Sequence, residues 1–388
     1  MGSKITITDD IRYIGVNDHD LDLFEGQYIV PNGMAYNSYV ILDEKIAVFD
    51  TVEVHFGEEW MGQLLEALGG RTPDYLIVQH MEPDHSANIV RFMDAFPAAT
   101  IVGSAQAFAM LKQFYGHEYA ERKLVVKDKD TLDLGGRQLQ FVSAPMVHWP
   151  EVMMTYDPKT RTLFSADGFG KFGALDVDED WACEARRYYF GIVGKFGKQV
   201  QALLKKTSAL EIERICALHG PILDTDLDYY LGLYNTWSSY GVETEGIAIC
   251  YTSVYGHTKE AAELLAEKLE AAGCPKVAVT DLARDDMAEA VEDAFRYGTL
   301  VLASTTYNMG VFPFMSDFIE RLVDHGYTKR RVALIENGTW APAAAKTMRA
   351  KFEKAKDIEF CETVVTIKSA LDDASRAQLD ALVAELMA

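Results

Sequence analysis

The segment LIVQHMEPDH, residues 76–85, joins a short apolar run to a group of polar side chains. The run 76–79 is typical of a buried strand, and it ends at His80. Alternate side chains of an extended chain point the same way, so we expect His80, Glu82 and Asp84 to converge on one side of a loop. An imidazole with two carboxylates is a ligand set for transition metals. The segment predicts a metal site, although a charged surface turn would explain any one of these residues alone.

Three later residues occupy the same kind of position. His148 lies in APMVHWPE, Asp167 in LFSADGFG and His219 in ICALHGP. Each follows a short apolar run and precedes a glycine or proline, where a strand gives way to a loop. A single buried histidine is as easily a satisfied core residue as a ligand. The recurrence at strand ends favours one shared site.

The sequence around these residues predicts a sandwich of two sheets with helices outside, an αββα arrangement. Strand–turn–strand patterns and helical patterns alternate, and a longer helical region and an aromatic-rich segment follow them. The strand pairs are expected at 39–50, 132–144 and 153–163, the helices at 57–69, 86–95, 104–115 and 183–206, and the aromatic-rich segment at 226–240.

The pattern changes after residue 245. Five short apolar runs alternate with five helical patterns up to residue 387, which predicts a doubly wound parallel α/β sheet. A chain of 388 residues is also too long for one ordinary core. We therefore expect two domains, residues 1–244 and 245–388.

Three loops of the second region are candidates for binding a flavin mononucleotide. Hydroxyls at Thr252, Ser253 and Thr258, together with helix N-terminal amides, form an anion site suited to a phosphate monoester. Such residues are also common helix caps, and chance aromatics at sheet-end turns are the alternative. The order of the loops, each at the carboxyl end of a strand, strengthens the prediction. The candidate contacts are Thr252, Ser253, Val254, Tyr255, Gly256, His257, Thr258, Ser304, Thr305, Thr306, Tyr307, Asn308, Met309, Gly310, Asn337, Gly338, Thr339 and Trp340.

Composition narrows the class of protein. The net charge of −22 repels phosphate backbones and anionic lipid, so we expect neither nucleic-acid binding nor membrane association. The five cysteines are scattered without a Cys-x-x-Cys pair, and no signal-peptide pattern occurs, which predicts a reduced, cytoplasmic protein. The glycine-rich phosphate loops of NAD- and ATP-binding proteins are missing.

His80-x-Glu82-x-Asp84-His85, followed by His148, Asp167 and His219, resembles the metallo-β-lactamase signature with Glu82 in place of its second histidine. With the flavodoxin-like region appended, nearly the whole chain resembles the flavodiiron proteins (A-type flavoproteins). This resemblance implies two iron ions per chain. His80, Glu82 and His148 would bind one ion, Asp84 and His219 the other, and Asp167 would bridge them. His85 would be a spare or outer residue.

The resemblance also implies a function: reduction of O2 to water, of NO to N2O, or of both, with FMN relaying electrons from an external donor. That donor would be a rubredoxin, a flavin reductase or a reduced deazaflavin coenzyme. A head-to-tail homodimer, or a dimer of dimers, would bring the flavin of one subunit to the metals of the other. Glu82, a hard anionic donor, favours iron over zinc.

Two alternatives stay open. One is a dinuclear zinc hydrolase with an accessory flavodoxin-like module, and the other is an electron carrier with a vestigial metal site. Two departures from the family pattern also matter. Glu25 in Phe-Glu-Gly stands where many relatives have a histidine, which leaves the preferred gas open, and His257 replaces the usual asparagine of flavodoxins. Tyr188 and Tyr189 could line the metal pocket, although packing in an aromatic helix is the favoured role.

Overall fold

The computed structural model describes residue 5 and residues 7–388, and the described chain separates into two compact units. The first unit extends to Tyr188 and includes Lys198–Asn235. The second comprises Tyr189–Gly197 and Thr236–Ala388, so a short segment from the middle of the chain belongs to it. Domain limits at residues 1–244 and 245–388 stay a prediction.

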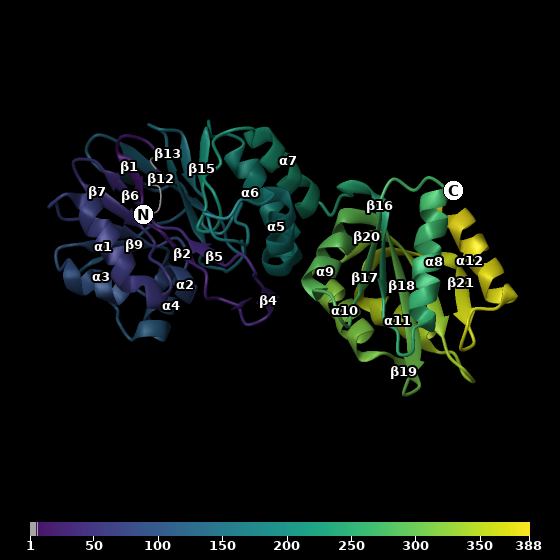
Figure 1. Cartoon of the computed structure of the whole chain (residues 1–388). Coiled ribbons are helices and arrows are strands. Elements are labelled where there is room, and N and C mark those ends of the chain that lie inside the picture. Colours follow the sequence, from purple (N-terminus) through teal and green to yellow (C-terminus); the bar gives the residue numbers. More distant parts are fainter. Residues whose placement is uncertain (1–4, 6) are drawn as a thin grey trace. The chain divides into compact units, whose positions relative to one another are not determined.

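Two sheets form the centre of the first unit (Figure 1). One core cluster draws residues from both sheets, and the rings of Phe49 and Phe164 stack across it with centroids 4.1 Å apart. The first sheet has the order β1 (Ile11–Tyr13), β6 (Tyr39–Leu42), β7 (Ile46–Phe49), β8 (Tyr75–Ile77), β9 (Thr100–Gly103) and β10 (Lys123–Val125). The second has the order β11 (Thr131–Asp133), β12 (Gln138–Ser143), β13 (Met153–Asp157), β14 (Thr162–Phe164) and β15 (Arg214–Cys216).

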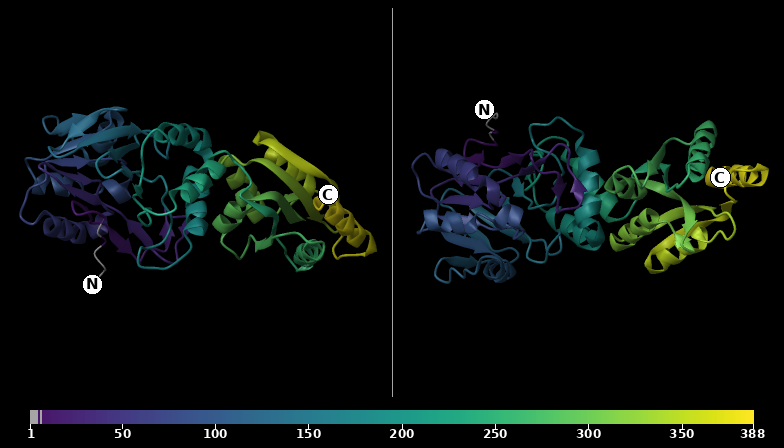
Figure 2. Two further views of the ribbon diagram at one scale, coloured as in Figure 1. Left: turned by 90° about the horizontal axis from the view of Figure 1, so that it is seen from above. Right: turned by 60° about the horizontal axis from the view of Figure 1, so that its bottom comes forward.

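Helices accompany both sheets, and the αββα prediction is confirmed (Figures 1 and 2). They are α1 (Gly57–Leu68), α2 (Pro83–Ser86), α3 (Ile89–Ala95) and α4 (Ala105–Tyr115), then α5 (Trp181–Tyr188), α6 (Gly197–Thr207) and α7 (Leu227–Ser238). Their ends follow local chemistry. Ser104 accepts a hydrogen bond from the N–H of Ala107 and caps α4, and Gly69 takes the left-handed conformation that ends α1.

The single helix expected over residues 183–206 is interrupted. Between α5 and α6 the chain forms a π-helical turn, Tyr189–Val193, and a 3-10 turn, Gly194–Phe196. Glycine is a poor residue for the interior of a helix, and residues 189–197 carry three of them. A side chain at Gly197 would also lie 2.4 Å from the carbonyl oxygen of Ser238, so this close approach requires glycine.

The strands before residue 37 were not predicted, because they are only two or three residues long and carry too little periodicity. They are β2 (Val16–Asp18), which pairs with β5 (Met34–Tyr36), and β3 (Leu23–Phe24), which pairs with β4 (Tyr28–Ile29), in addition to β1. The tip of the β3–β4 hairpin holds Glu25 in a left-handed conformation.

The second unit is a parallel sheet with the strand order β17-β16-β18-β20-β21, which confirms the doubly wound prediction. Helices α8 and α12 cover one face of the sheet, because one hydrophobic core contains residues of both helices and of the strands. Helix α10 contacts α9 and α11, and α9 and α11 also contact β18. The strands are β16 (Thr244–Tyr251), β17 (Val277–Asp281), β18 (Tyr297–Tyr307), β20 (Thr328–Asn337) and β21 (Lys356–Ile367), and a short β19 (Gly310–Val311) pairs with β18. The helices are α8 (His257–Ala271), α9 (Met287–Arg296), α10 (Pro313–Asp324), α11 (Ala344–Lys351) and α12 (Asp373–Leu386).

In the part of the chain that the structure describes, no helix combines the length and apolar character needed to cross a bilayer.

Candidate metal centre

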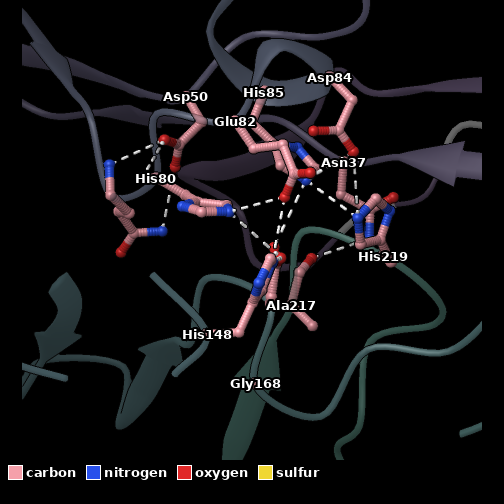
Figure 3. Close-up of polar contacts among 12 residues, drawn as sticks. Asn37, Asp50, His80, Glu82, Asp84, His85, His148, Gly168, Ala217 and His219 are labelled. Carbon is pink, nitrogen blue, oxygen red and sulfur yellow. Dashed lines mark hydrogen bonds and ion pairs between the residues drawn. The ribbon is translucent and has the colours of Figure 1, made fainter. Parts of the chain in front are cut away.

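All six predicted metal ligands come together in the first unit. Figure 3 labels His80, Glu82, Asp84, His148 and His219. His80, Glu82 and Asp84 follow β8, His148 lies between β12 and β13, Asp167 follows β14, and His219 follows β15. Their donor atoms form two clusters, within each of which the atoms lie no more than 4.8 Å apart. The first cluster is His80, Glu82, His148 and Asp167, and the second is Asp84, His85 and His219.

Imidazole nitrogens face carboxylate oxygens in the first cluster. The Glu82 Oε2 atom lies 3.1 Å from the Nε2 atoms of both His80 and His148. The His148 Nε2 atom also lies 3.0 Å from the Oδ2 atom of Asp167. One carboxylate therefore faces both histidines of this cluster.

His85 belongs to the second cluster, where the sequence had not placed it. Its Nε2 atom lies 3.2 Å from Asp84 Oδ2 and 3.0 Å from His219 Nε2. The prediction of an extended segment fails at Pro83, which begins α2 because proline suits the first turn of a helix. The helical turn directs Asp84 and His85 toward His219, while Glu82, just before it, faces the first cluster.

Asp167 lies between the two clusters. Its Oδ2 atom faces His148 and, at 3.5 Å, His80 Nε2, whereas its Oδ1 atom lies 3.4 Å from His85 Nε2. The side chain is almost fully buried. Gly170 lets the loop close on this site, since a Cβ there would lie 3.3 Å from the Cβ of His219.

The hydrogen bonds of Nδ1 in His80 and His219 determine which ring nitrogen of each histidine is available to a metal. His80 Nδ1 lies 2.8 Å from the Glu151 carboxylate, and His219 Nδ1 lies 2.8 Å from the carbonyl oxygen of Ala35. Both oxygens only accept hydrogen bonds, so each Nδ1 carries the proton. The Nε2 lone pairs are then directed into the clusters, as metal coordination requires.

The buried histidines and carboxylates of the two clusters shift one another's pKa values. Burial opposes the charged form of His148, but hydrogen bonds to Asp167 and Glu82 outweigh it and raise its pKa to about 9. Burial lowers the pKa of His85 to about 4, although the charge of Asp84 opposes this shift. Burial would also raise the pKa of Asp167, but the neighbouring histidines, led by His80, hold it well below its usual value. Protons on imidazoles thus compensate buried carboxylates.

The donor set fits two metal ions. Both carboxylate oxygens of Asp84 and the Oδ1 atom of Asp167 are buried and accept no hydrogen bond from the described residues. Two Nε2 atoms also face each other, an arrangement that a shared cation or proton stabilises. Buried polar atoms without a hydrogen-bond partner are rare in folded proteins and need an explanation, which a bound ion would supply here.

Tyr188, in α5, adds a hydroxyl to the site. Its ring centroid lies 5.5 Å from that of His219, and its Oη atom is buried without a hydrogen-bond partner in the described chain. Burial, then the charges of Asp167 and Glu82, raise its pKa well above the usual value. Sequence reasoning favoured packing because an aromatic residue in a helix gives no signal of a polar role.

Glu25 lies at the surface, on the β3–β4 hairpin. The ring centroid of its neighbour Phe24 lies 5.5 Å from that of His219. Partial burial of the carboxyl group and the charge of Glu82 raise its pKa to about 7. The charge of the first cluster thus acts on Glu25, the residue that stands where many members of the resembling family have a histidine.

The candidate flavin loops of the second unit lie together at the carboxyl ends of the strands. Thr252 Oγ1 lies 3.0 Å from Ser304 Oγ, and Thr258 Oγ1 lies 3.1 Å from Thr305 Oγ1, so the first and second loops are in contact. The Oγ atom of Ser253 accepts a hydrogen bond from Gly256 N at the start of α8.

The third loop is fixed by its neighbours. The Thr306 hydroxyl accepts hydrogen bonds from the N–H groups of Ala343 and Ala344. Asn337 exchanges hydrogen bonds with the backbone of Ser369, so its side chain is occupied within the protein. Several apolar side chains of the three loops are unusually exposed: Tyr255 91%, Trp340 88%, Met309 74%, Tyr307 45% and Val254 43%. Exposed aromatic and apolar surface of this kind is typical of binding sites, and the flavin contacts of these loops stay a prediction.

Comparisons with known proteins agree with this combination of units. The chain matches the family model described as "ODP family beta lactamase" over residues 34–220 and the model described as "Flavodoxin domain" over residues 248–365. The fold and the site thus define a β-lactamase-like domain with a candidate metal site, joined to a flavodoxin-like domain.

Relatives define the family. A nitric oxide reductase of Moorella thermoacetica is 30% identical over 92% of this chain and 91% of its own length. A diflavin flavoprotein of Nostoc sp. is 31% identical over 92% of this chain, which spans only 62% of that longer protein. The rubredoxin oxygen:oxidoreductase of Desulfovibrio gigas has the same fold, with a TM-score of 0.92 at 22% identity over 99% of this chain and 98% of that one. The chain belongs to the flavodiiron protein family.

Proposed function

We propose that this chain is a flavodiiron oxidoreductase that reduces O2 to water, NO to N2O, or both, with electrons relayed through FMN. The observation that carries the proposal is the pair of buried clusters that share Asp167. Such a site can hold two redox-active ions close enough to act on one small substrate. Relatives described as a nitric oxide reductase and as a rubredoxin oxygen:oxidoreductase support the reaction class.

In this proposal His80, Glu82 and His148 hold one iron ion, Asp84 and His219 hold the other, and Asp167 bridges them. The position of His85 supports adding it to the second ion. The bound irons would supply gas binding and electron transfer. Glu82 favours iron because an anionic oxygen donor stabilises a trivalent ion better than imidazole does.

The other residues of the site handle protons and hydrogen bonds. Both reactions consume protons, and Glu25, with a pKa of about 7, is able to release one near neutral pH. Tyr188 can donate a hydrogen bond from its unpartnered hydroxyl to the substrate. The buried surroundings of this hydroxyl strengthen such a bond because water does not compete for it.

FMN is proposed to bind the three loops at the sheet edge. Its phosphate would contact Thr252, Ser253 and Thr258 at the N-terminus of α8, and its ring would lie against the exposed Tyr307 and Trp340. The electron donor is proposed to be a separate rubredoxin, a flavin reductase or a reduced deazaflavin coenzyme. A head-to-tail homodimer, or a dimer of such dimers, would bring flavin and metals together. Sedimentation of an active monomer would contradict that assembly.

The decisive experiment compares anaerobic NO consumption with aerobic O2 consumption, using one reduced donor and one preparation of known metal and flavin content. Two irons, one FMN and turnover of at least one gas are expected. Two zinc ions without flavin absorbance would favour the dinuclear hydrolase. Flavin reduction without gas turnover in the iron-loaded protein would favour the electron carrier.

A further inference from the structure

The two metal clusters differ in the groups that stand behind their histidines. His80 Nδ1 donates its hydrogen bond to the carboxylate of Glu151, and both side chains have no solvent exposure. His219 Nδ1 donates to a neutral backbone carbonyl, that of Ala35. His85 Nδ1 has no hydrogen-bond partner among the described residues. The first cluster thus has a negative charge behind a ligand, whereas the second has a neutral dipole.

Glu151 is held firmly in this role. Its Oε1 atom, which accepts from His80, also accepts from the N–H of Met81 at 2.9 Å. Its backbone carbonyl accepts from the hydroxyl of Ser104 at 3.1 Å. The carboxylate is therefore anchored to both the ligand ring and the ligand loop, and a change of its rotamer would leave two buried donors unpaired.

A carboxylate behind an imidazole changes the metal-binding nitrogen. The negative charge polarises the Nδ1–H bond and makes Nε2 more basic, which strengthens its bond to a cation. The effect is large in a buried site because water does not screen the charge. A backbone carbonyl orients the ring in the same way but supplies only a partial charge. Each cluster otherwise has one carboxylate of its own, Glu82 or Asp84, and both share Asp167.

We infer that Glu151 makes the two metal positions unequal: the position at His80, Glu82 and His148 binds its ion first and more tightly, and that at Asp84, His85 and His219 fills second. Glu151 acts through His80 and is a positioning residue. This inference rests on the proposed two-metal site and extends it to the order of loading.

Metal titration of the whole, metal-free chain tests the inference independently of gas turnover. Cobalt(II) is the probe, added anaerobically in competition with a chromophoric chelator and followed by its visible absorption bands. The wild type should bind two ions in separate steps. Glu151→Gln keeps an acceptor but removes the charge, and it should weaken the first step by roughly 10- to 100-fold while leaving the second unchanged.

Asp157→Asn is the matched control. Asp157 is also a buried carboxylate of the first unit, paired with Arg137 at 2.8 Å, but it lies at the far end of β13 from the ligand loops. This variant should keep both steps of the wild type. Should Glu151→Gln fail to fold, anomalous scattering from wild-type crystals with one equivalent of cobalt should still place the ion at the first position.

The outcomes distinguish the inferred order of metal loading from the proposed gas reduction. Two equal steps in the wild type, equal weakening of both steps by Glu151→Gln, or a first cobalt ion at the second position would overturn the inference alone. A chain that binds unequal metals but reduces neither gas would contradict only the proposed function. A wild-type chain that binds no pair of ions would overturn both.

Discussion

Replacing Tyr188 with phenylalanine should stabilise the metal-free protein while it impairs the enzyme. The Tyr188 hydroxyl is buried and unpaired, and an unsatisfied buried polar group costs about 1–3 kcal/mol. Phenylalanine removes that cost and keeps the ring, whose centroid lies 5.2 Å from that of Phe172 and 5.5 Å from that of His219. We expect the free energy of unfolding to rise by about 1 kcal/mol, or roughly 2–4 °C in Tm for a unit of this size.

The activity of the Tyr188→Phe variant should fall although its stability rises. If the hydroxyl donates to the substrate, removing one preorganised donor should lower kcat by about 100-fold, as for other such donors. Thermal and urea unfolding of the metal-free protein and gas consumption by the iron-loaded protein measure the two effects. Metal and flavin content should equal those of the wild type.

Tyr234→Phe is the matched control. Tyr234 is also fully buried, but its hydroxyl accepts a hydrogen bond of 2.6 Å from the N–H of Phe169. Its loss leaves that N–H unpaired and should destabilise the protein by about 1–3 kcal/mol. A Tyr188→Phe variant that is destabilised like the control, or that retains full turnover, would refute the reasoning.

Four further predictions concern the bridge, the hairpin and the flavin loops. Asp167→Ala removes the shared carboxylate and should abolish gas reduction and reduce iron to well below two per chain, as measured by metal analysis; full activity would contradict a catalytic metal centre. Glu25 is protonated below its pKa of about 7, so the wild-type rate of gas consumption should fall as pH rises through that value. Glu25→Gln should flatten this step in the pH profile. Glu25→His should change the ratio of O2 to NO turnover. Thr258→Val should weaken FMN binding by about 10-fold or more, because it removes one hydrogen bond to a charged phosphate; calorimetry measures this, and unchanged affinity would argue against the phosphate site. FMN should also quench the fluorescence of the exposed Trp340, and Trp340→Phe should remove that part of the signal.

Local patterns were sufficient where the elements are long. The five strands and five helices of the second unit follow from apolar runs separated by helical periodicity, and their order fixes a parallel sheet. The same reasoning missed β2 and β5, and the largely exposed start of β21 at Lys356 is not an apolar run. Short strands form because they pair with neighbouring strands, and sequence periodicity does not predict such pairing. The same holds for the first part of β21, which pairs with β20 up to Val332, where the register shifts.

The sequence by itself determined the ligand types and their places at strand ends. His80, Glu82 and Asp84 were recognisable as candidate ligands because they occupy alternate positions after one apolar run, and His148, Asp167 and His219 because each follows another such run. Glu82 was recognisable as the departure from the metallo-β-lactamase signature from which the preference for iron was predicted.

The resemblance implied how these side chains are shared between two positions, and only the tertiary structure placed His85 with Asp84 and His219. Pro83 begins a helical turn that directs Asp84 and His85 away from the first cluster, and Asp167 offers one oxygen to each cluster. Tyr188 and Glu151 joined the site through contacts between distant segments, and no local periodicity encodes such contacts. The physical reason is that burial and hydrogen-bond partners, which set the charge of each donor, exist only after the two sheets have packed together.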